Sequence, residues 1–416
     1  MSTRTESISA IVAEAKRQGF FDPGKHPGLR LSQEELKELL RQLEKNKIPY
    51  GKPAGDEASE PQLAPAEARR VVDALRRGIP AADCMGCYSV GREVLMGRVG
   101  AELSTVTNRR SLVRFLNADI GQGKTHALYL LRELAFRHGF AVSIVTLSQN
   151  SCPLYDFMAV YHEIMWGLRT DDQRLKPALS NIIDRWMHDI QDLGAPRVRE
   201  IVYKELPPHL RNVMAAYASA SNLFRPDETK RQLVLKYLGG DPISQRDLRD
   251  LEIGVKLDSQ NALEILSEVA ATIRYIGFKG ICILFDEAEA IHSFAYSAHR
   301  DQAYANLRQI IRKSQNFPHC YFVYATTPSF FENYSSASLV DASGQESLLE
   351  LEPIRERDKA TIGEKIAGIY RVATGVEYSP KVISAIEKAA TVDGRIGDYV
   401  RQVIAILDEV RSQRGR

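Results

Sequence analysis

The sequence has few cysteines and tryptophans, almost no net charge and no long apolar run. It holds 5 Cys and 2 Trp in 416 residues, with a formal net charge of +2. No apolar stretch approaches the ~18–20 residues that a helix needs to cross a bilayer, so we expect no membrane span. The first twenty residues are charged and lack a secretory core, which favours a cytoplasmic protein. The low net charge excludes a strongly basic protein, so any nucleic-acid contact must come from a local patch.

The five cysteines suit a reducing compartment better than a disulfide framework, because they are few and widely spread. Cys84 and Cys87 form one C-x-x-C motif, which is half of a zinc site or a redox pair. No second pair and no Cys/His cluster completes it. The sequence therefore does not favour zinc or redox chemistry at this pair.

The composition changes along the chain predict several units. Residues 1–50 indicate a small unit of two helices, the second opening with the capping-box pattern "SQEE" at Ser32. Residues 51–65 combine Gly, Pro, Ala and acidic residues and predict a linker. We expect a nucleotide-binding domain over residues 66–354 and a helical lid over residues 355–416.

The first helix after the linker carries two pairs of arginines. Arg69 and Arg70 recur one heptad later as Arg76 and Arg77, on a helix whose apolar residues begin at Val71. The four arginines form either a phosphate-binding stripe or a solvated helix face. The second interpretation is the commoner one for a run of charges.

Short runs of β-forming residues, separated by helical patterns, predict an α/β fold. Near-continuous apolar strands of this kind indicate a parallel sheet that is covered on both faces. The second and third runs are separated by residues 149–280, which show helical periodicity and far exceed the dozen residues of a crossover. We therefore expect a large helical insertion there. The predicted strands are 112–118, 141–148, 281–288 and 320–327, with a weaker fifth at 347–354.

The segment "ADIGQGKT" (118–125) fits the P-loop pattern, with Ala118 where Gly is usual. It lies between a predicted strand and a predicted helix, as the pattern requires. Its backbone N–H groups would surround a phosphate, Lys124 would reach the β and γ phosphates, and the hydroxyl of Thr125 would ligate Mg²⁺. The residues expected to contact ATP are Ala118, Asp119, Ile120, Gly121, Gln122, Gly123, Lys124, Thr125 and His126.

Polar residues end the third and fourth predicted strands. In "ILFDEAEA", Asp286 would hold Mg²⁺ and Glu287 would polarise the attacking water, while Glu289 is structural or a gate. The fourth strand ends in Thr326 and Thr327, either of which would orient the water or contact the γ phosphate. Threonine is also a good strand former, and the sequence does not choose between the two.

Hydrolysis also requires positive charge against the transferred phosphoryl group. Arg395 and Arg401 lie near the start of the last predicted helix and would act from the lid. Arg308 and Arg312, on the helix before the fourth strand, would act on the nucleotide of a neighbouring subunit. A surface role is as common as a catalytic one for each of these arginines.

Several longer stretches resemble one family. The order of P-loop, acidic pair, polar strand end and arginine-bearing lid resembles AAA+ ATPases of the origin-initiator type. The sequence is more narrowly similar to the BREX ATP-binding proteins of the BrxD type, which act in bacterial phage defence. That likeness covers roughly residues 65–410. The stretches that carry it are "EARRVVDALRRGIP", "YSVGRE", "NADIGQGKTHALYLLRELAFRHGFAV", "DEAEAI" and "LEPIRERD".

The resemblance implies binding and hydrolysis of ATP with Mg²⁺, other defence-system proteins as partners, and a motor or switch that acts on or near DNA. We also expect ATP to promote self-association. Initiator ATPases carry a C-terminal winged-helix domain, whereas this sequence ends at Arg416 directly after the lid, so we expect no sequence-specific DNA contact. The alternative is a nucleotide-controlled scaffold that recruits protein partners through residues 149–280, hydrolyses ATP slowly and has no direct DNA role.

Overall fold

The structure is a computed structural model that describes residues 63–106, 111–190, 195–221, 226–314, 319–332, 339, 347–392 and 394–414. The chain divides into two compact units, Met1–Gln62 and Leu63–Arg416. The predicted helices of residues 1–50 and nearly all of the predicted linker 51–65 lie outside the described residues. The description that follows concerns the second unit.

A five-stranded parallel sheet forms the centre of this unit, in the order β2-β3-β4-β1-β5. All five predicted strands are present, which confirms the predicted α/β class. Each strand ends before its predicted limit, because the chain turns away where the apolar run gives way to loop residues. The strands are β1 (Leu112–Asn117), β2 (Ala141–Thr146), β3 (Ile281–Asp286), β4 (Cys320–Thr326) and β5 (Leu348–Glu350).

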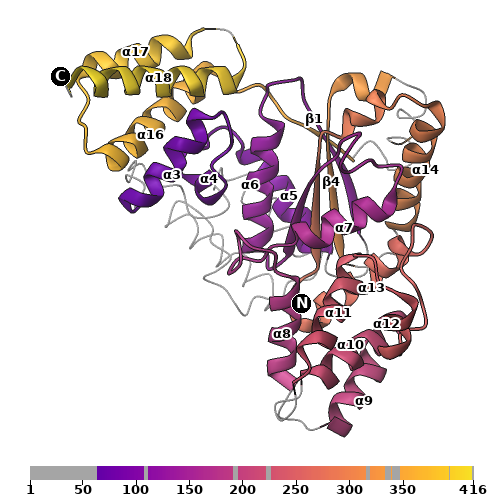
Figure 1. The fold of residues 1–416 in the computed structure, drawn as a ribbon. Helices are drawn as coiled ribbons and strands as arrows, with labels where there is room; N and C mark the ends of the chain where they lie inside the picture. The colour runs from indigo at the N-terminus through magenta and orange to yellow at the C-terminus, as the bar shows by residue number, and fades with distance from the viewer. Residues whose placement is uncertain are drawn as a thin grey trace, which may run out of the picture. The chain divides into compact units, whose positions relative to one another are not determined.

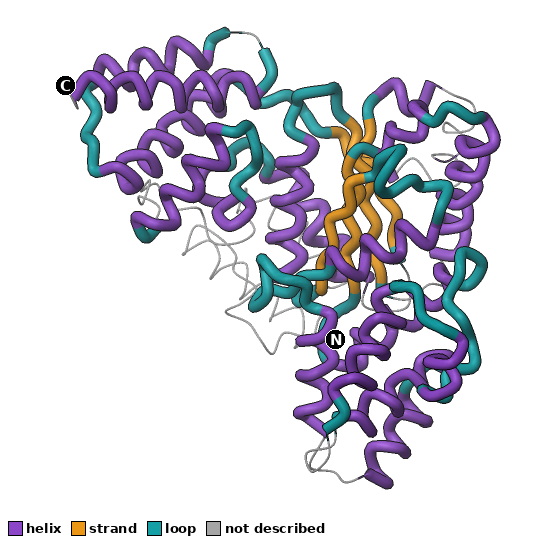
Figure 2. Tube along the Cα trace, viewed as in Figure 1, coloured by secondary structure: helices purple, strands orange, loops and turns teal. Residues whose placement is uncertain are grey.

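Helices cover both faces of the sheet (Figures 1 and 2). On one face, α5 (Glu93–Val106) and α6 (Lys124–Arg137) share a core with alternate strand residues such as Leu284 and Val323. On the other face, α14 (Ser297–Ser314) and the insertion helices pack on Phe285 and similar residues. Alternation along each strand therefore sends successive side chains into two separate cores.

The predicted helical insertion is present between β2 and β3. Its first helix packs on β2, and its apolar residues join the core of that sheet face, so the insertion is anchored on the sheet. In the described part of the insertion and its base, two isolated bridges, Val142 to Arg169 and Thr170 to Gln173, add β pairing outside the sheet. The helices are α7 (Phe157–Gly167), α8 (Leu179–Ile190), α9 (Ala195–Glu205), α10 (Pro208–Ala220), α11 (Glu228–Gly239), α12 (Gln245–Asp250) and α13 (Ala262–Ile276).

The C-terminal helices form a third core together with the first helix of the unit. They are α16 (Glu356–Thr374), α17 (Pro380–Ala390) and α18 (Ile396–Arg414). The apolar stripe of α16, formed by Ile362, Ile366 and Ile369, is buried, and Gly375 ends the helix with a left-handed φ of 72°. Helix α3 (Pro65–Arg76), which the sequence placed in the nucleotide-binding domain, packs its apolar face into this core. The lid core is thus built from both ends of the unit.

Most of the arginines on α3 are engaged within the chain. Arg76 contacts both oxygens of Asp408 on α18, at 2.8 and 3.0 Å. Arg69 donates to the carbonyl of Ala373, and Arg77 donates to the carbonyl of Asp73. Three of the four arginines thus hold α3 together or against the lid, which favours a structural role over a phosphate-binding stripe.

Three short 3-10 segments connect these elements. They are η2 (Ala82–Cys84), which leads into the single-turn helix α4 (Met85–Tyr88), η4 (Ala288–Ser293) after β3, and η5 (Pro328–Glu332) after β4. Among the described residues, no helix is both long and apolar enough to cross a membrane.

Candidate functional site

The loop between β1 and α6 has the backbone of a phosphate-binding turn. Gly121 and Gly123 adopt left-handed φ values of 86° and 92°, which glycine tolerates without strain. Gly123 is the N-cap of α6, whose first N–H groups have no intrahelical acceptors and point out of the helix end. Ala118 is buried, and its N–H donates to the carbonyl of Thr326. Alanine therefore fits where glycine is usual.

The side chain of Lys124 is largely buried at the start of α6, 11% exposed. Its Nζ donates to the carbonyl of Ala118 at 3.0 Å and lies 3.7 Å from Oε1 of Glu289. The other carboxylate oxygen of Glu289 is buried and has no hydrogen-bond partner within the described chain. Lys124, which the sequence assigns to the phosphates, is thus paired with Glu289. The sequence predicted only a structural or gating role for this glutamate.

Thr125 and Asp286 come together, although they are 161 residues apart. The hydroxyl of Thr125 donates to Oδ2 of Asp286 at 2.7 Å, and the N–H of Glu287 donates to Oδ1 of Asp286 at 3.0 Å. Asp286 is 6% exposed, so these two hydrogen bonds fix a carboxylate that is nearly removed from solvent. The two residues predicted to hold a metal ion are therefore adjacent, with oxygen donors.

Glu287 lies just after β3 and adopts a left-handed φ of 59°, which is uncommon for a residue with a side chain. This backbone turns its side chain away from the strand direction. Burial raises the pKa of Glu287, and the nearby charges of Asp286 and Glu289 raise it further, while Lys124 opposes them. A carboxyl group with a raised pKa among charged neighbours is typical of functional sites.

The alternation of β4 separates the two threonines that the sequence could not distinguish. Tyr321, Val323 and Ala325 point into the core of the α6 face, whereas β4 ends at Thr326 and Thr327 follows the strand. Phe322 and Tyr324 point into the opposite core, and Thr326 follows them. Thr326 therefore faces away from the P-loop helix, which leaves Thr327, the first residue after β4, as the candidate.

The hydroxyl groups of these two threonines also differ in their hydrogen-bond partners. The side-chain oxygen of Thr326 is buried and finds no acceptor or donor among the described residues. The hydroxyl of Thr327 lies 2.9 Å from that of Ser329. Thr326 is thus in the core, whereas Thr327 is at the end of the sheet.

The four arginines predicted from the sequence lie in different places. Arg395 packs directly over the loop, since a Cβ on Gly121 would lie 2.5 Å from its Cγ and Cδ. Arg401 pairs with Asp398 and lies beside Gly78, with an exposed side chain. Arg308 and Arg312 are on α14, whose core is on the opposite face of the sheet from α6. Within one chain, the structure brings only Arg395 of these four to the P-loop.

Arg92 is a site residue that the sequence analysis did not assign, although it is part of the "VGRE" segment. Its guanidinium donates to the carbonyl of Gln122 in the loop at 3.0 Å and to that of Glu352 at 2.5 Å. Burial lowers its pKa, and the nearby carboxylates of Glu93, Asp358 and Glu352 oppose that shift. The sequence signal for a role in holding the loop was the position of this arginine in a short motif before the P-loop strand.

His126 faces the segment before α5 rather than the loop. Its Nε2 lies 2.7 Å from Oγ of Ser89, and its ring contacts Tyr88 edge-on at 5.4 Å between centroids. Burial and the charge of Arg92 lower the pKa of His126 to about 4, so its imidazole is neutral near pH 7. Because the hydroxyl of Ser89 donates to the carbonyl of Met85, Nε2 of His126 is the donor in their contact.

Comparison with known proteins decides the family. The family model described as BREX system ATP-binding protein BrxC/D matches residues 63–412. The chain belongs to this family. Its members are ATP-binding proteins of a bacterial defence system, which agrees with the resemblance found in the sequence.

The remaining comparisons add little. The search of curated proteins gives no match. Among solved structures, the Orc2 protein of Aeropyrum pernix, described in ADPNP and ADP complexes, is 15% identical with a TM-score of 0.38. The alignment covers 78% of this chain and 64% of that one, so this chain spans less than two thirds of its length.

Proposed function

We propose that this BrxC/D family member binds ATP at residues 118–125 and hydrolyses it with Mg²⁺. The observation that carries the proposal is the convergence of Lys124, Thr125, Asp286 and Glu287 at one edge of the sheet. An ammonium group, a hydroxyl and two carboxylates beside a helix N-terminus suit a metal-bound polyphosphate. Along the chain, the two P-loop residues come first and the acidic pair comes later, as the sequence predicts.

The oxygen donors of Thr125 and Asp286 fit a magnesium ion. Hard divalent cations prefer hydroxyl and carboxylate oxygens, and the two hydrogen bonds to Asp286 hold its carboxylate in one orientation. Magnesium bound there would neutralise charge on the phosphates during transfer. Lys124 would supply the second positive charge, after leaving its ion pair with Glu289.

Glu287 is the proposed general base. In its deprotonated form it would accept a proton from the attacking water, and a base with a raised pKa binds that proton more strongly. Turnover should fall as the pH drops through this pKa, and the fall should begin at a higher pH than for an exposed glutamate. Thr327 would orient the same water, and Arg395 would place charge on the phosphoryl group from the lid.

Assembly is the part of the proposal that concerns neighbouring subunits. Arg308 and Arg312 lie across the sheet from this chain's own loop, so either would act only on the nucleotide of another copy. An arginine supplied in this way typically contributes ~10³–10⁵ in rate. We therefore propose that ATP promotes self-association and that specific activity rises with protein concentration.

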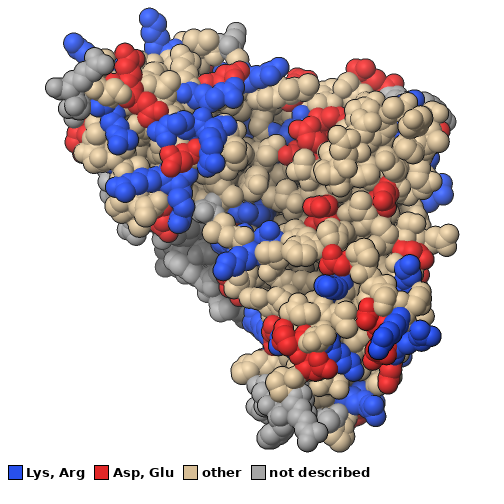
Figure 3. Space-filling view, viewed as in Figure 1, with Lys and Arg blue, Asp and Glu red and all other residues tan. Residues whose placement is uncertain are grey.

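Turnover would drive a motor or switch that works on or near DNA, with other defence-system proteins, in the cytoplasm. On the face drawn in Figure 3, Lys and Arg side chains are mixed with Asp and Glu rather than gathered in one basic field. Without one extended basic field on this face, any contact with DNA phosphates through it would be weak and would not read sequence. We therefore propose DNA contact without sequence specificity.

A groove on the insertion supports the second candidate, a nucleotide-controlled scaffold with slow hydrolysis. The groove has a volume of about 530 Å³ and lies between α7, α8 and α11. It includes Trp166, half of whose surface is exposed, together with Leu235 and Pro242. Exposed aromatic side chains in a groove are common where proteins bind one another.

The test measures ATP affinity by calorimetry and phosphate release with and without duplex DNA. Lys124→Ala should abolish binding, whereas Lys204→Ala, an exposed lysine of the insertion, should leave it unchanged. Glu287→Gln should keep ATP bound and slow hydrolysis by roughly 10²-fold or more. Wild-type turnover in that variant would exclude Glu287 as the base, and Glu289→Gln would be tested next. Stimulation by DNA favours the motor or switch; nucleotide-dependent partner binding without a DNA effect favours the scaffold.

A further inference from the structure

Cys84 and Cys87 are joined in a disulfide, with their Cα atoms 5.4 Å apart. The sequence did not favour redox chemistry at this pair, whereas the structure joins the two sulfur atoms. A zinc site receives no support, since no group of three or more metal ligands gathers anywhere in the described chain. The pair closes a loop of four residues that includes the whole turn from Cys84 to Cys87.

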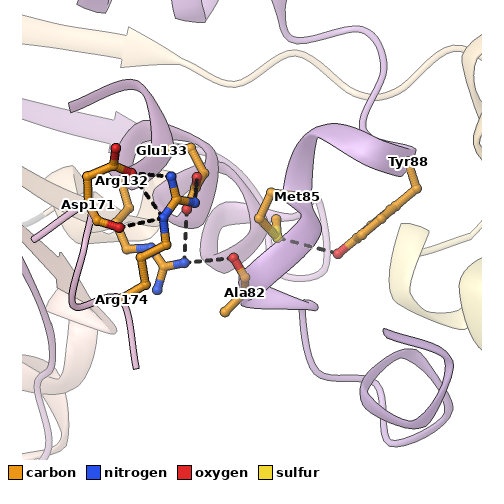
Figure 4. Close-up of polar contacts among 7 residues, drawn as sticks. All are labelled: Ala82, Met85, Tyr88, Arg132, Glu133, Asp171 and Arg174. Atoms are coloured by element: carbon orange, nitrogen blue, oxygen red, sulfur yellow. Dashed lines mark hydrogen bonds and ion pairs between the residues drawn. The ribbon is translucent and has the colours of Figure 1, made fainter. Parts of the chain in front are cut away.

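The disulfide-closed segment is attached to α6 on both sides. Before it, the carbonyl of Ala82 accepts a hydrogen bond from Arg132 on α6 at 2.7 Å (Figure 4). After it, Ser89 accepts from His126 at 2.7 Å, and His126 is the residue next to Thr125. The two attachments are six residues apart on α6. The conformation of residues 82–89 is therefore coupled to the helix that begins with the P-loop lysine.

The attachment through Arg132 is rigid, because its partners fix it. Arg132 is 5% exposed and contacts Glu133 at 3.0 Å. Glu133 is in turn bonded to Arg174, which pairs with Asp171 in the insertion (Figure 4). Buried charges that are paired in this way resist movement, since breaking one pair leaves the other charges without compensation.

The same segment also belongs to the lid. Cys84, Met85 and Tyr88 are buried in one core with α16, α17 and α18. Directly after the turn, Tyr88 donates to the sulfur of Met85 and accepts from the N–H of Ala81 (Figure 4 draws the Tyr88–Met85 contact). The turn between the two cysteines is therefore the joint between the lid core and α6.

We propose that Cys84 and Cys87 form a redox modification site that controls nucleotide affinity. The disulfide holds the turn in the conformation that fixes α6 and the lid around the loop. The dithiol leaves the turn freer, so ATP binding must order it. Oxidised protein therefore binds ATP more tightly than reduced protein. This inference rests on the proposed ATP site at Lys124.

The chemistry is thiol–disulfide exchange with a small disulfide such as oxidised glutathione. The thiolate of Cys87, the more exposed of the two, attacks one sulfur of the oxidant and releases one glutathione. The thiolate of Cys84 then attacks the bound Cys87 sulfur and expels the second glutathione. Two electrons pass to the oxidant, and the two protons lost by the cysteines end on the two glutathione thiols.

The other cysteines do not compete for this reaction. Cys152, Cys282 and Cys320 are all buried. Burial raises the pKa of each thiol, that of Cys152 to about 12, so little thiolate forms near neutral pH. Changes caused by mild oxidation can therefore be assigned to the Cys84–Cys87 pair.

The experiment uses the full chain, equilibrated in buffers of reduced and oxidised glutathione. Alkylation and mass spectrometry count the thiols, and calorimetry measures ATP affinity in each buffer. We expect loss of two thiols, mapped to Cys84 and Cys87, and affinity about fivefold tighter in the oxidised state, a coupling typical of linked sites. A Cys84→Ser/Cys87→Ser variant should bind ATP equally in both buffers, and Cys152→Ser should respond like the wild type.

Three results would overturn the inference. They are failure of the pair to oxidise in any glutathione buffer, equal ATP affinity in the two states, and zinc held by the reduced pair in native mass spectrometry. None of these would affect the proposed function, which Lys124→Ala tests separately. If that variant binds ATP normally in both states, the ATP site itself is wrong.

Discussion

Replacing Glu289 by Gln should tighten ATP binding, which is the opposite of what most substitutions at a binding site do. Glu289 lies 3.7 Å from Lys124, and both side chains are largely buried, 23% and 11% exposed. ATP phosphates must compete with this carboxylate for the lysine ammonium. Glutamine keeps the shape of the side chain and removes the charge, so the ammonium becomes available without competition.

The distance between the two groups sets the size of the effect. At this separation the Coulomb attraction is about 1 kcal/mol in a water-like dielectric and about 4 kcal/mol at an effective dielectric of 20. Desolvation of both groups offsets much of the larger value, so we take about 1 kcal/mol as the net cost to ATP. This corresponds to roughly fivefold tighter binding of ATP by Glu289→Gln.

Calorimetry with ATP at low and high salt measures this change. Glu377→Gln is the matched control for net charge, because Glu377 is exposed and pairs with Arg371 in the lid. It should leave ATP affinity unchanged. Glu287→Gln removes a charge from the same edge of the sheet. It therefore shows how much of the gain in ATP affinity comes from lowering the negative charge of the whole site. We expect the gain in Glu289→Gln to be the larger of the two.

Weaker or unchanged ATP binding in Glu289→Gln would refute the reasoning. It would mean that Lys124 does not have to leave Glu289 when ATP binds, and that the carboxylate supports the bound state. An equal gain in ATP affinity in Glu287→Gln would also contradict it. The effect would then come from the overall negative charge of the site and not from the Lys124–Glu289 ion pair.

Three further predictions concern the lid and the sheet edge. Arg395→Ala should lower turnover by at least about tenfold, because its side chain packs on the loop, while Arg401→Ala should stay near wild type in phosphate-release assays. Thr327→Val should slow turnover about tenfold with ATP affinity retained in calorimetry, since it would leave the attacking water misplaced. Gly363→Ala should lower thermal stability by about 1–3 kcal/mol, because a Cβ there would lie 2.3 Å from the hydroxyl of Tyr399. Gly368→Ala on the same helix meets nothing within 4 Å and should not destabilise it in the same melting assay.

Local sequence determined the strands, the loop and the helical insertion. Each strand is a short run of apolar residues, and the loop is a pattern of eight consecutive residues, so both signals lie within one segment of the chain. The apolar stripe of α16 and its end at Gly375 are local in the same sense, because helical periodicity and a left-handed terminator each lie within one segment of the chain. Family resemblance also rests on such stretches.

Tertiary structure decided the matters that depend on distant residues. It buries Thr326 on the face opposite the P-loop helix, because the face of a strand residue is known only when both cores are known. It brings Arg395 over Gly121, although 274 residues separate them (395 − 121 = 274), and it pairs Lys124 with Glu289. These contacts are set by long-range packing, which no local pattern of residue types encodes.

The role of α3 shows the same division within a single helix. The sequence alone determines that α3 is amphipathic, since its apolar residues recur at helical spacing, and the structure buries them. Which core receives that face was decided by the return of the chain some three hundred residues later, when Asp408 on α18 meets Arg76. An apolar stripe specifies burial but not its partner, because the hydrophobic effect is not directional.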